Sequence, residues 1–128
     1  MKFKHFSMTK KSPLLSSAYC KFLKLAAAVE SLPGVDLLDP NDRALFDQIV
    51  LAWNQRQPLT VNQAITLSAL GSQSTLHKRV MKLRELDFVE FVIDHNDQRV
   101  KHLAPTEKGR KCLEKLNQAI LKSFQASS

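Results

Sequence analysis

The tight turn Leu70-Gly71-Ser72 is the feature that most restricts how this chain can fold. It separates two short segments whose apolar residues have helical spacing, one over 60–70 and one over 72–86. The first segment begins with Thr60 and has Gln63 three residues later, which is the capping-box pattern of a helix start. In the second segment the apolar residues recur every three or four positions, at Leu76, Val80, Leu83 and Leu86. Two helices joined by so short a glycine-containing turn form a helix-turn-helix.

The hydrophobic period then changes from helical to strand-like. The segment 88–94 is rich in β-branched and aromatic residues, which favours a strand. The polar residues 95–98 predict a turn, and a second strand is predicted over 99–103. Val100 and Leu103 have opposite parity in that strand, which a β-bulge or a hairpin tip that leaves the sheet would explain. A two-stranded β-wing is therefore expected after the helix-turn-helix.

Two further helices are indicated by their first residues. Asp39-Pro40 is an N-cap followed by proline, and it begins a helix with one broad apolar face that ends near Gln57-Pro58. Thr106 caps a last helix, predicted over 106–125. The sequence thus predicts a mainly α fold with a small β-wing (α+β), a winged helix-turn-helix with helices at both ends. One domain over 1–128 is expected, with a basic arm over 1–11 and the winged helix-turn-helix core over 40–105.

The N-terminal helix, predicted over 12–32, carries a narrow apolar seam. Ser12-Pro13 begins the helix and Pro33-Gly34 ends it. The seam residues alternate at intervals of three and four, as in helices that pack lengthwise: Leu15, Ala18, Phe22, Leu25, Val29 and Leu32. Such a seam suits either the chain's own core or a homodimer interface. A stripe on the last helix is assigned to the same interface: Leu113, Leu116, Ile120 and Phe124.

Composition and charge exclude several classes of protein. Of the 128 residues 44 % are hydrophobic, which is ordinary for a globular chain and argues against disorder. The two cysteines, Cys20 and Cys112, make neither a disulfide framework nor a cysteine-based zinc site. A net charge of +7 favours an anionic partner, nucleic acid before a membrane surface. Positive charge gathers in 1–30 and 72–111 around an acidic middle, which indicates an oriented anion-binding surface.

The sequence gives no sign of export, of a membrane span or of catalysis. Its most apolar stretch, Phe22 to Val29, is interrupted by Lys24 and is too short to cross a bilayer, so a soluble cytoplasmic protein is expected. Nucleophile-elbow, P-loop, zinc-protease and dinucleotide motifs are absent, and the histidines have no metal-ligand spacing. We therefore expect no enzyme activity, no catalytic residue, no metal and no cofactor.

Four short motifs follow one another between residues 59 and 111. They are Leu59-Thr60-Val61-Asn62-Gln63-Ala64, then Ser74-Thr75-Leu76 with Lys82-Leu83-Arg84-Glu85-Leu86, then Asp97-Gln98-Arg99, and Thr106-Glu107-Lys108-Gly109-Arg110. In this order and spacing they resemble the DNA-binding region of MarR-type bacterial transcriptional regulators, over roughly half the chain. The resemblance implies a winged-helix regulator of transcription that binds double-stranded DNA as a homodimer.

The sequence departs from that family in two places. Family members generally close the dimer with two C-terminal helices, and only one fits after Thr106. Because the family's small-molecule pocket adjoins that region, a small-molecule effector is possible but is not carried over. The glycine that usually precedes the first wing strand is replaced by Asp87-Phe88. Cys20 beside Tyr19 is similar to the reactive cysteine of redox-sensing members, and the alternative is a thiol without a role.

The chemistry of base reading assigns contacts to the second motif helix. Its first turn has short polar side chains that let the backbone approach bases and phosphates: Ser72, Gln73, Ser74 and Thr75. One turn later, polar and basic side chains lie opposite the apolar stripe: His77, Lys78 and Lys82. We assign Gln73 and His77 to base edges, Lys78 to guanine or phosphate, and Lys82 to phosphate. The alternative for each is an exposed side chain that contacts nothing.

Arg99 at the tip of the predicted wing is assigned to the minor groove. Narrow A·T-rich grooves attract arginine, and a wing tip has the shape to insert one. The family resemblance implies that Asp97 holds this arginine in position. The alternative is a surface ion pair of little energetic weight. Lys101 and His102, on the returning strand, are weaker candidates for phosphate contacts.

These assignments predict a regulator that binds a pseudo-palindromic duplex, with inverted half-sites about one helical turn apart. Two alternatives belong to other classes. One is a winged-helix module that binds protein or RNA, or an accessory protein of a plasmid or phage. The other is a switch that responds to a ligand or an oxidant on the same fold.

Overall fold

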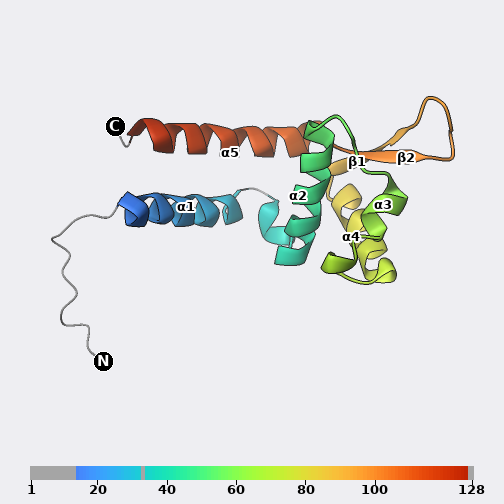
Figure 1. The fold of residues 1–128 in the computed structure, drawn as a ribbon, viewed down its shortest axis with the longest axis horizontal. Coiled ribbons are helices and arrows are strands. Elements are labelled where there is room, and N and C mark those ends of the chain that lie inside the picture. The colour runs from blue at the N-terminus through green and yellow to red at the C-terminus, as the bar shows by residue number, and fades with distance from the viewer. Residues whose placement is uncertain (1–13, 33, 127–128) are drawn as a thin grey trace.

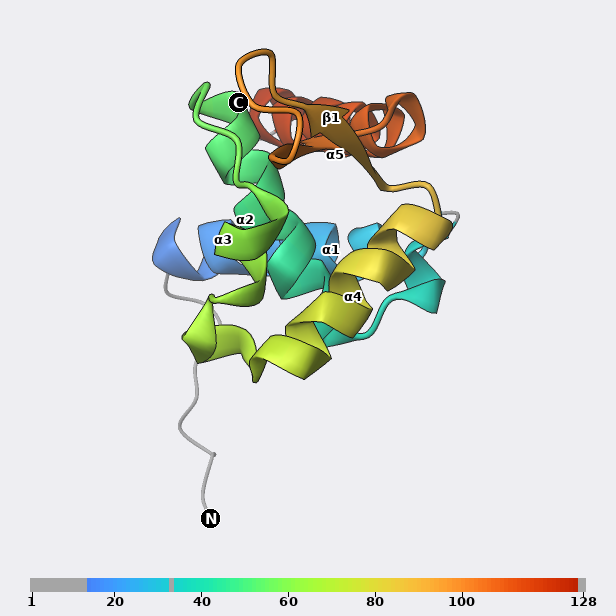
Figure 2. The same ribbon diagram turned by 90° about the vertical axis from the view of Figure 1, so that its right-hand side faces the viewer.

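The computed structural model describes residues 14–32 and 34–126, and the side chains of all of these except 14–17, 123, 124 and 126. Within this part the elements are α1 Leu14–Glu30, α2 Pro40–Asn54, α3 Val61–Ile65, α4 Gln73–Glu85, β1 Val89–Ile93, β2 Lys101–Pro105 and α5 Glu107–Ala126. Figure 1 shows α1 and α5 side by side at one end of an elongated molecule and the β1–β2 hairpin, the wing, at the other. In Figure 2 the wing lies above α4, with α2 and α3 beside α4. The predicted mainly α fold with a small β-wing is confirmed.

Two of the predicted helix starts form complete capping boxes. The Asp39 carboxylate accepts the backbone N–H groups of Asn41 and Asp42 at 2.9 Å each, and the Asp42 carboxylate accepts that of Asp39 at 3.0 Å. Thr60 and Gln63 exchange the same pair of hydrogen bonds, at 2.9 and 3.0 Å. Each box satisfies N–H groups that a helix start would otherwise leave unpaired.

The first helix of the helix-turn-helix is shorter than predicted. It was expected to extend to Leu70, but α3 ends at Ile65 and the chain resumes as a 3₁₀ turn over Ser68–Leu70. The Thr66 hydroxyl donates to the carbonyl oxygen of Gln63 at 2.8 Å, at the point where the helix stops. A second 3₁₀ turn, over Val35–Leu37, was not predicted.

The wing also differs from its prediction at one boundary. β2 begins at Lys101 rather than at residue 99, and it pairs antiparallel with β1 without a bulge, from Val89 opposite Pro105 to Ile93 opposite Lys101. Val100 lies before the strand, where its carbonyl oxygen accepts the N–H of Asp94 at 3.0 Å. The parity mismatch therefore reflects the hairpin tip, which is one of the two explanations expected.

The N-terminal helix lies within its predicted range. Gly34 after α1 has a left-handed φ of 89°, which glycine adopts without strain. The arm over 1–11, the Ser12-Pro13 cap and Pro33 lie outside the described residues.

The core lies between α2, α4 and the wing. Its fully buried apolar side chains are Leu45, Ile49, Ala64, Leu76, Val80, Leu83, Phe88, Val89 and Leu103. The Phe46 and Phe88 rings meet edge to face, with centroids 5.6 Å apart. The predicted inward stripe of α4 is confirmed. Because each such side chain contributes about 1.5–3 kcal/mol when fully buried, this core fixes the inner face of α4 and leaves its outer face to solvent.

The family motif at the start of α5 forms what we call the wing-root junction, made of Asp87, Phe88, Thr106 and Gly109. The Thr106 hydroxyl donates to the carbonyl oxygen of Asp87 and accepts the N–H of Gly109 at 3.0 Å. A Cβ atom at Gly109 would lie 2.5 Å from the Phe88 carbonyl oxygen, so only glycine fits. Asp87 has a φ of 67°, a left-handed conformation that aspartate tolerates better than most residues. Aspartate thus replaces the glycine expected at this turn.

Candidate nucleic-acid interface

The polar side chains at the start of α4 form two groups, one hydrogen-bonded within the helix cap and one exposed to solvent. The Ser72 side chain caps the helix, accepting the N–H of Thr75 at 3.3 Å, and its hydroxyl donates to the Thr75 hydroxyl at 3.0 Å. Ser72 and Thr75 are therefore engaged with each other. Gln73 and Ser74, beside them, are exposed.

One turn further along α4, His77 and Lys78 are also exposed. Together with Gln73 and Ser74 they form an outer face that is polar and basic, whereas Leu76 and Val80 of the same helix are fully buried. The structure thus places these four predicted contact residues on the surface of α4. Their contacts with DNA stay predictions.

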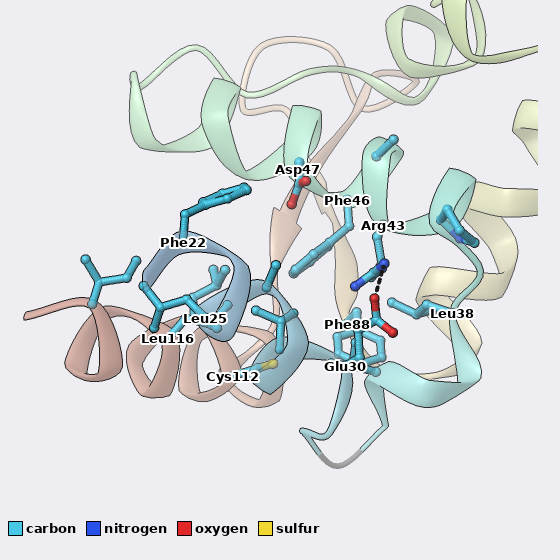
Figure 3. A pocket seen from close by; sticks show the side chains of 17 residues that line it. Phe22, Leu25, Glu30, Leu38, Arg43, Phe46, Asp47, Phe88, Cys112 and Leu116 are labelled. Atoms are coloured by element: carbon cyan, nitrogen blue, oxygen red, sulfur yellow. Dashed lines mark hydrogen bonds and ion pairs between the residues drawn. The ribbon is translucent and has the colours of Figure 1, made fainter. Parts of the chain in front are cut away.

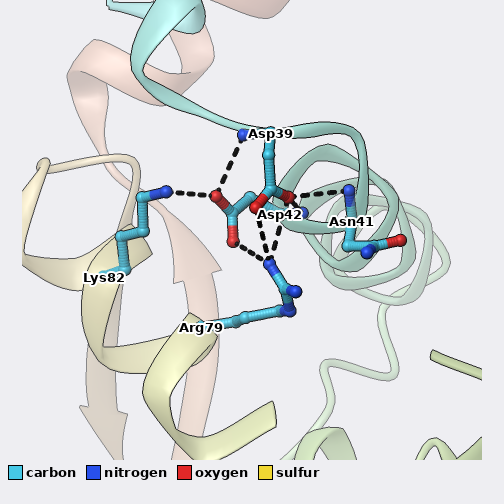
Figure 4. Close-up of polar contacts among 5 residues, drawn as sticks. All are labelled: Asp39, Asn41, Asp42, Arg79 and Lys82. Carbon is cyan, nitrogen blue, oxygen red and sulfur yellow. Dashed lines mark hydrogen bonds and ion pairs between the residues drawn. The ribbon is translucent and has the colours of Figure 1, made fainter. Parts of the chain in front are cut away.

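Lys82 has a partner that the sequence did not indicate. Its ammonium group lies 2.5 Å from Oδ2 of Asp42, a carboxylate on α2 that is fully buried. Arg79, also on α4, donates from one guanidinium nitrogen to Asp42 at 2.8 Å and to both carboxylate oxygens of Asp39 at 3.0 Å. Figure 4 shows the carboxylates of Asp42 on α2 and of Asp39, its N-cap, directed at the two cations of α4. We call these four residues the Asp42 cluster.

The electrostatics of the Asp42 cluster keep both carboxylates ionised. Burial acts to raise the pKa of Asp42, but hydrogen bonds from Lys82, from the Asp39 backbone and from Arg79 together hold that pKa below its usual range. The backbone N–H of Asp42 and the guanidinium of Arg79 likewise lower the pKa of Asp39. The cluster therefore joins α4 to α2 by charged hydrogen bonds.

This pairing does not by itself exclude the predicted phosphate contact of Lys82. Its side chain is 41 % exposed, and an ammonium group has three N–H donors, of which Asp42 accepts one. The phosphate contact stays a prediction, now for a residue that also has a structural partner.

The tip of the wing presents Arg99 to solvent. Its side chain is 90 % exposed, and it binds Asp97 through two nitrogens, Nε to Oδ1 at 3.1 Å and Nη2 to Oδ2 at 3.2 Å. These hydrogen bonds hold the pKa of Asp97 below its usual range. The contact that the family resemblance implied between Asp97 and Arg99 is thus present, and the insertion of Arg99 into a groove stays a prediction.

His102 is held inside the hairpin. Its Nε2 atom lies 3.0 Å from Oδ1 of Asp94, whose other oxygen accepts the backbone N–H groups of Asn96 and Asp97 at 2.9 and 3.0 Å. The contact with His102 is the main reason why the pKa of Asp94 is lowered. Sequence reasoning missed this pair, which closes the turn from within. Lys101, next to His102, is exposed.

The predicted dimer-interface residues gather around an apolar cavity between α1, α2 and α5. This cavity has a volume of about 630 Å³, and six of those residues line it: Phe22, Leu25, Val29, Leu113, Leu116 and Ile120. Figure 3 shows Leu25, Phe46, Phe88 and Leu116 along it, with an ion pair between Glu30 and Arg43 at 3.3 Å. Leu32 packs against the core nearby.

The outer side of the same helices exposes large apolar groups. Phe22 is 59 % exposed and stacks on the equally exposed Tyr19, and Leu23, Ile120 and Leu121 are exposed too. Ala18 is exposed, whereas the side chains of Leu15 and Phe124 lie outside the described residues. The seam thus meets the chain's own helices along the cavity, while Ala18, Phe22 and Ile120 also remain exposed to solvent.

The cysteines occupy different surroundings. Cys20 is exposed on α1, and Cys112 is half-buried in the cavity wall, where burial raises the pKa of its thiol. Within residues 14–32 and 34–126, no three side chains of His, Cys, Asp or Glu are grouped to hold a metal ion. None of the helices in that part is both long and apolar enough to cross a membrane.

Comparison with solved structures identifies the fold. S. aureus MepR bound to ethidium bromide is similar, with a TM-score of 0.64 and 15 % identity over 98 % of this chain and 80 % of that one. S. aureus MepR in complex with DNA gives a TM-score of 0.61 and 17 % identity over 91 % and 89 %. Streptococcus pneumoniae FabT in complex with DNA gives 0.55 and 20 % over 89 % and 78 %. No family model and no curated protein matches the sequence. The chain has the winged-helix fold of MarR-type regulators.

Proposed function

We propose that this chain, with the fold of MarR-type regulators, is a sequence-specific transcriptional regulator that binds double-stranded DNA as a homodimer and has no enzymatic activity. Residues 1–128 act as one winged-helix unit. α4 reads bases in the major groove through Gln73 and His77, with Lys78 and Lys82 on guanine or phosphate. Arg99 enters the adjacent minor groove. The bound site contains inverted half-sites about one helical turn apart.

The observation that carries this proposal is the exposed outer face of α4 next to an exposed arginine at the wing tip. Both elements pack on the same hydrophobic core, so a single duplex can meet both. Two of the similar structures, those of MepR and FabT, are complexes with DNA, which supports the same partner here. The uncovered apolar residues of α1 and α5 support pairing of two copies.

Selection of bound sequences from a random duplex library tests the proposal. We expect an inverted repeat to emerge, and insertion of about half a helical turn between its halves to abolish tight binding. Gln73→Ala and His77→Ala should each weaken binding to the selected site by about 1–3 kcal/mol and binding to random duplex much less. If DNA affinity proves indifferent to α4 and to the wing, a module that binds protein or RNA becomes the better description.

Assembly is tested separately. Light scattering at micromolar concentration should give the mass of a dimer, and Leu25→Glu should release monomers because it places a charge in the apolar seam. A monomeric wild type would contradict the homodimer.

The apolar cavity favours a second candidate function, a switch that responds to a small molecule. Its volume of about 630 Å³ lies in the range of ligand pockets, and its mostly apolar lining includes the charged groups Glu30, Arg43 and Asp47. The similar MepR structure with ethidium bromide supplies a probe. Ethidium fluorescence should rise on binding, and Leu116→Trp, which reduces the cavity, should remove the effect. No response in the wild type would count against a ligand of this kind.

A further inference from the structure

A cleft separates α4 from the wing, and its lining is strongly basic. Its volume is about 450 Å³, and four of its ten lining residues are His77, Arg84, Arg99 and Lys101. None of those ten residues is a carboxylate. Arg84 is not among the residues that the sequence predicts to contact DNA.

Phe91 orders the cations of this cleft. The guanidinium carbon of Arg84 lies 4.3 Å from the centroid of the Phe91 ring, and the Lys101 ammonium lies 6.0 Å from it. A guanidinium that stacks through its flat face keeps the N–H groups at its edge available for an anion. Among the described residues, no carboxylate forms an ion pair with Arg84 or with Lys101.

The position of the cleft indicates which anion fits. α4 and the wing are assigned to a major groove and to the minor groove beside it, and one sugar-phosphate backbone separates two such grooves. A strand of DNA held by both elements therefore crosses the cleft. The basic lining complements its charge, and arginine pairs well with phosphate oxygens.

We propose that this cleft binds the phosphate backbone of the DNA strand that passes between α4 and the wing. Arg84 and Lys101 donate hydrogen bonds to phosphate oxygens, and the contact with the Phe91 ring restricts the position of the Arg84 guanidinium for those hydrogen bonds. This proposal rests on the proposed function, because it names the part of the DNA that this face takes. It concerns the backbone alone, so it carries no preference for any base sequence.

Salt titrations with a random-sequence duplex and with the selected inverted repeat test the proposal. Each phosphate contact contributes about 0.9 to the slope of log K against log salt. Arg84→Ala and Lys101→Ala should each reduce that slope by about one on both duplexes and leave the ratio of the two affinities unchanged. The matched control is Lys122→Ala on α5, an exposed lysine on the helix that leads away from the wing, which should keep the wild-type slope.

Two further variants separate charge from orientation. Phe91→Leu and Arg84→Lys keep the positive charges but remove the stacking surface or the flat guanidinium, so affinity should fall several-fold while the slope stays near the wild-type value. Thermal unfolding of each variant, compared with the wild type, checks that the wing still folds.

The outcomes distinguish this proposal from the proposed function. If wild-type protein binds duplex DNA and both alanine variants keep its slope, the cleft is not the backbone site, and the proposed function stands. If the slopes fall as expected but no sequence is preferred, the cleft is the backbone site and sequence-specific regulation is wrong. Wild-type protein that binds no duplex overturns both.

Discussion

Two aspartates of this chain each hold basic side chains of α4 or of the wing, but they do so in opposite surroundings. Asp97 holds Arg99 at the wing tip, where the arginine is 90 % exposed. Asp42 holds Arg79 and Lys82 of α4 and is itself fully buried. The contacts of Asp42 with Arg79 and Lys82, at 2.8 and 2.5 Å, are also shorter than those of Asp97 with Arg99, at 3.1 and 3.2 Å.

The two sites differ in whether the cation can exchange its aspartate partner for water or for a phosphate. In water an ion pair contributes little, so Arg99 can leave Asp97 for a phosphate or a groove without a large loss. A buried carboxylate cannot replace its partners by water, so Arg79 and Lys82 are required wherever Asp42 is ionised. The exposed pair is suited to binding and the buried cluster to fixing the position of α4.

The largest effect is expected from the buried carboxylate. Asp42→Ala should lower the free energy of unfolding by about 1.5–3 kcal/mol, because it removes the buried acceptor of charged hydrogen bonds from Arg79 and Lys82 and of the Asp39 backbone N–H. Urea denaturation measures this loss. Asp97→Ala is the matched control and should leave the free energy of unfolding unchanged within error.

A combined substitution tests whether unpaired charge causes the stability loss of Asp42→Ala. Replacing the charges together, with Asp42→Leu, Arg79→Leu and Lys82→Met, should recover most of the stability that Asp42→Ala loses. If the combined variant is as unstable as Asp42→Ala, the loss comes from packing rather than from unpaired charge.

Substitution of the exposed Arg99 should weaken DNA binding without changing the free energy of unfolding. Arg99→Ala should weaken DNA binding roughly tenfold, the size of one good groove contact, and most where the duplex under the wing is A·T-rich. Its urea denaturation should match the wild type. Fluorescence anisotropy with wing-site-substituted duplexes measures the first effect, and equal losses on all of them would remove the minor-groove assignment.

Lys82 pairs with the buried Asp42 and is also proposed to contact phosphate, so its substitution tests both roles. Lys82→Ala should reduce the slope of log K against log salt by about one, through loss of a phosphate contact, and should weaken selected and random duplexes alike. It should also lower the free energy of unfolding, by less than Asp42→Ala does, because Arg79 still pairs with Asp42. An unchanged slope together with lower stability would make Lys82 a purely structural residue.

The smallest effect is a dependence on acid. The pKa of Asp42 lies below its unperturbed value of 3.8 in the folded chain, so its stabilisation is complete above about pH 3.8 and is lost as pH falls through the lower folded-state value. The stability difference between wild type and Asp42→Asn should therefore be constant near neutral pH and should shrink below pH 3.8. Urea denaturation in steps of pH measures it, and a difference that already shrinks at neutral pH would contradict the lowered pKa.

Local chemistry made much of the fold predictable. Capping residues such as Asp39, Thr60 and Thr106 mark helix starts through their own side chains, and the structure has each of them in that role. The β-branched and aromatic residues after α4 predicted the wing because such side chains pack well on a pleated strand. Errors occurred where the deciding contact is a turn, as at Thr66 and at the start of β2.

The Asp42 cluster was missed because its partners are 37 and 40 residues apart in the chain. The sequence of α2 nevertheless indicates that Lys82 has a partner. Asp42 lies at spacings of three, four and seven from Leu45, Phe46 and Ile49, so it belongs to the buried face of that helix. A carboxylate in such a stripe requires a cation from another element, and the basic helix α4 was the available source.

The wing-root junction has a mechanical consequence. The first turn of α5 is fastened to the end of α4 and to the wing, since Lys108 donates to the Leu86 carbonyl at 2.9 Å and Arg110 to that of Pro105 at 2.9 Å, beside the hydrogen bonds of Thr106. The Phe88 carbonyl leaves Gly109 no room for a larger residue. A rotation of the first turn of α5 would therefore have to move the root of the wing with it or break these hydrogen bonds.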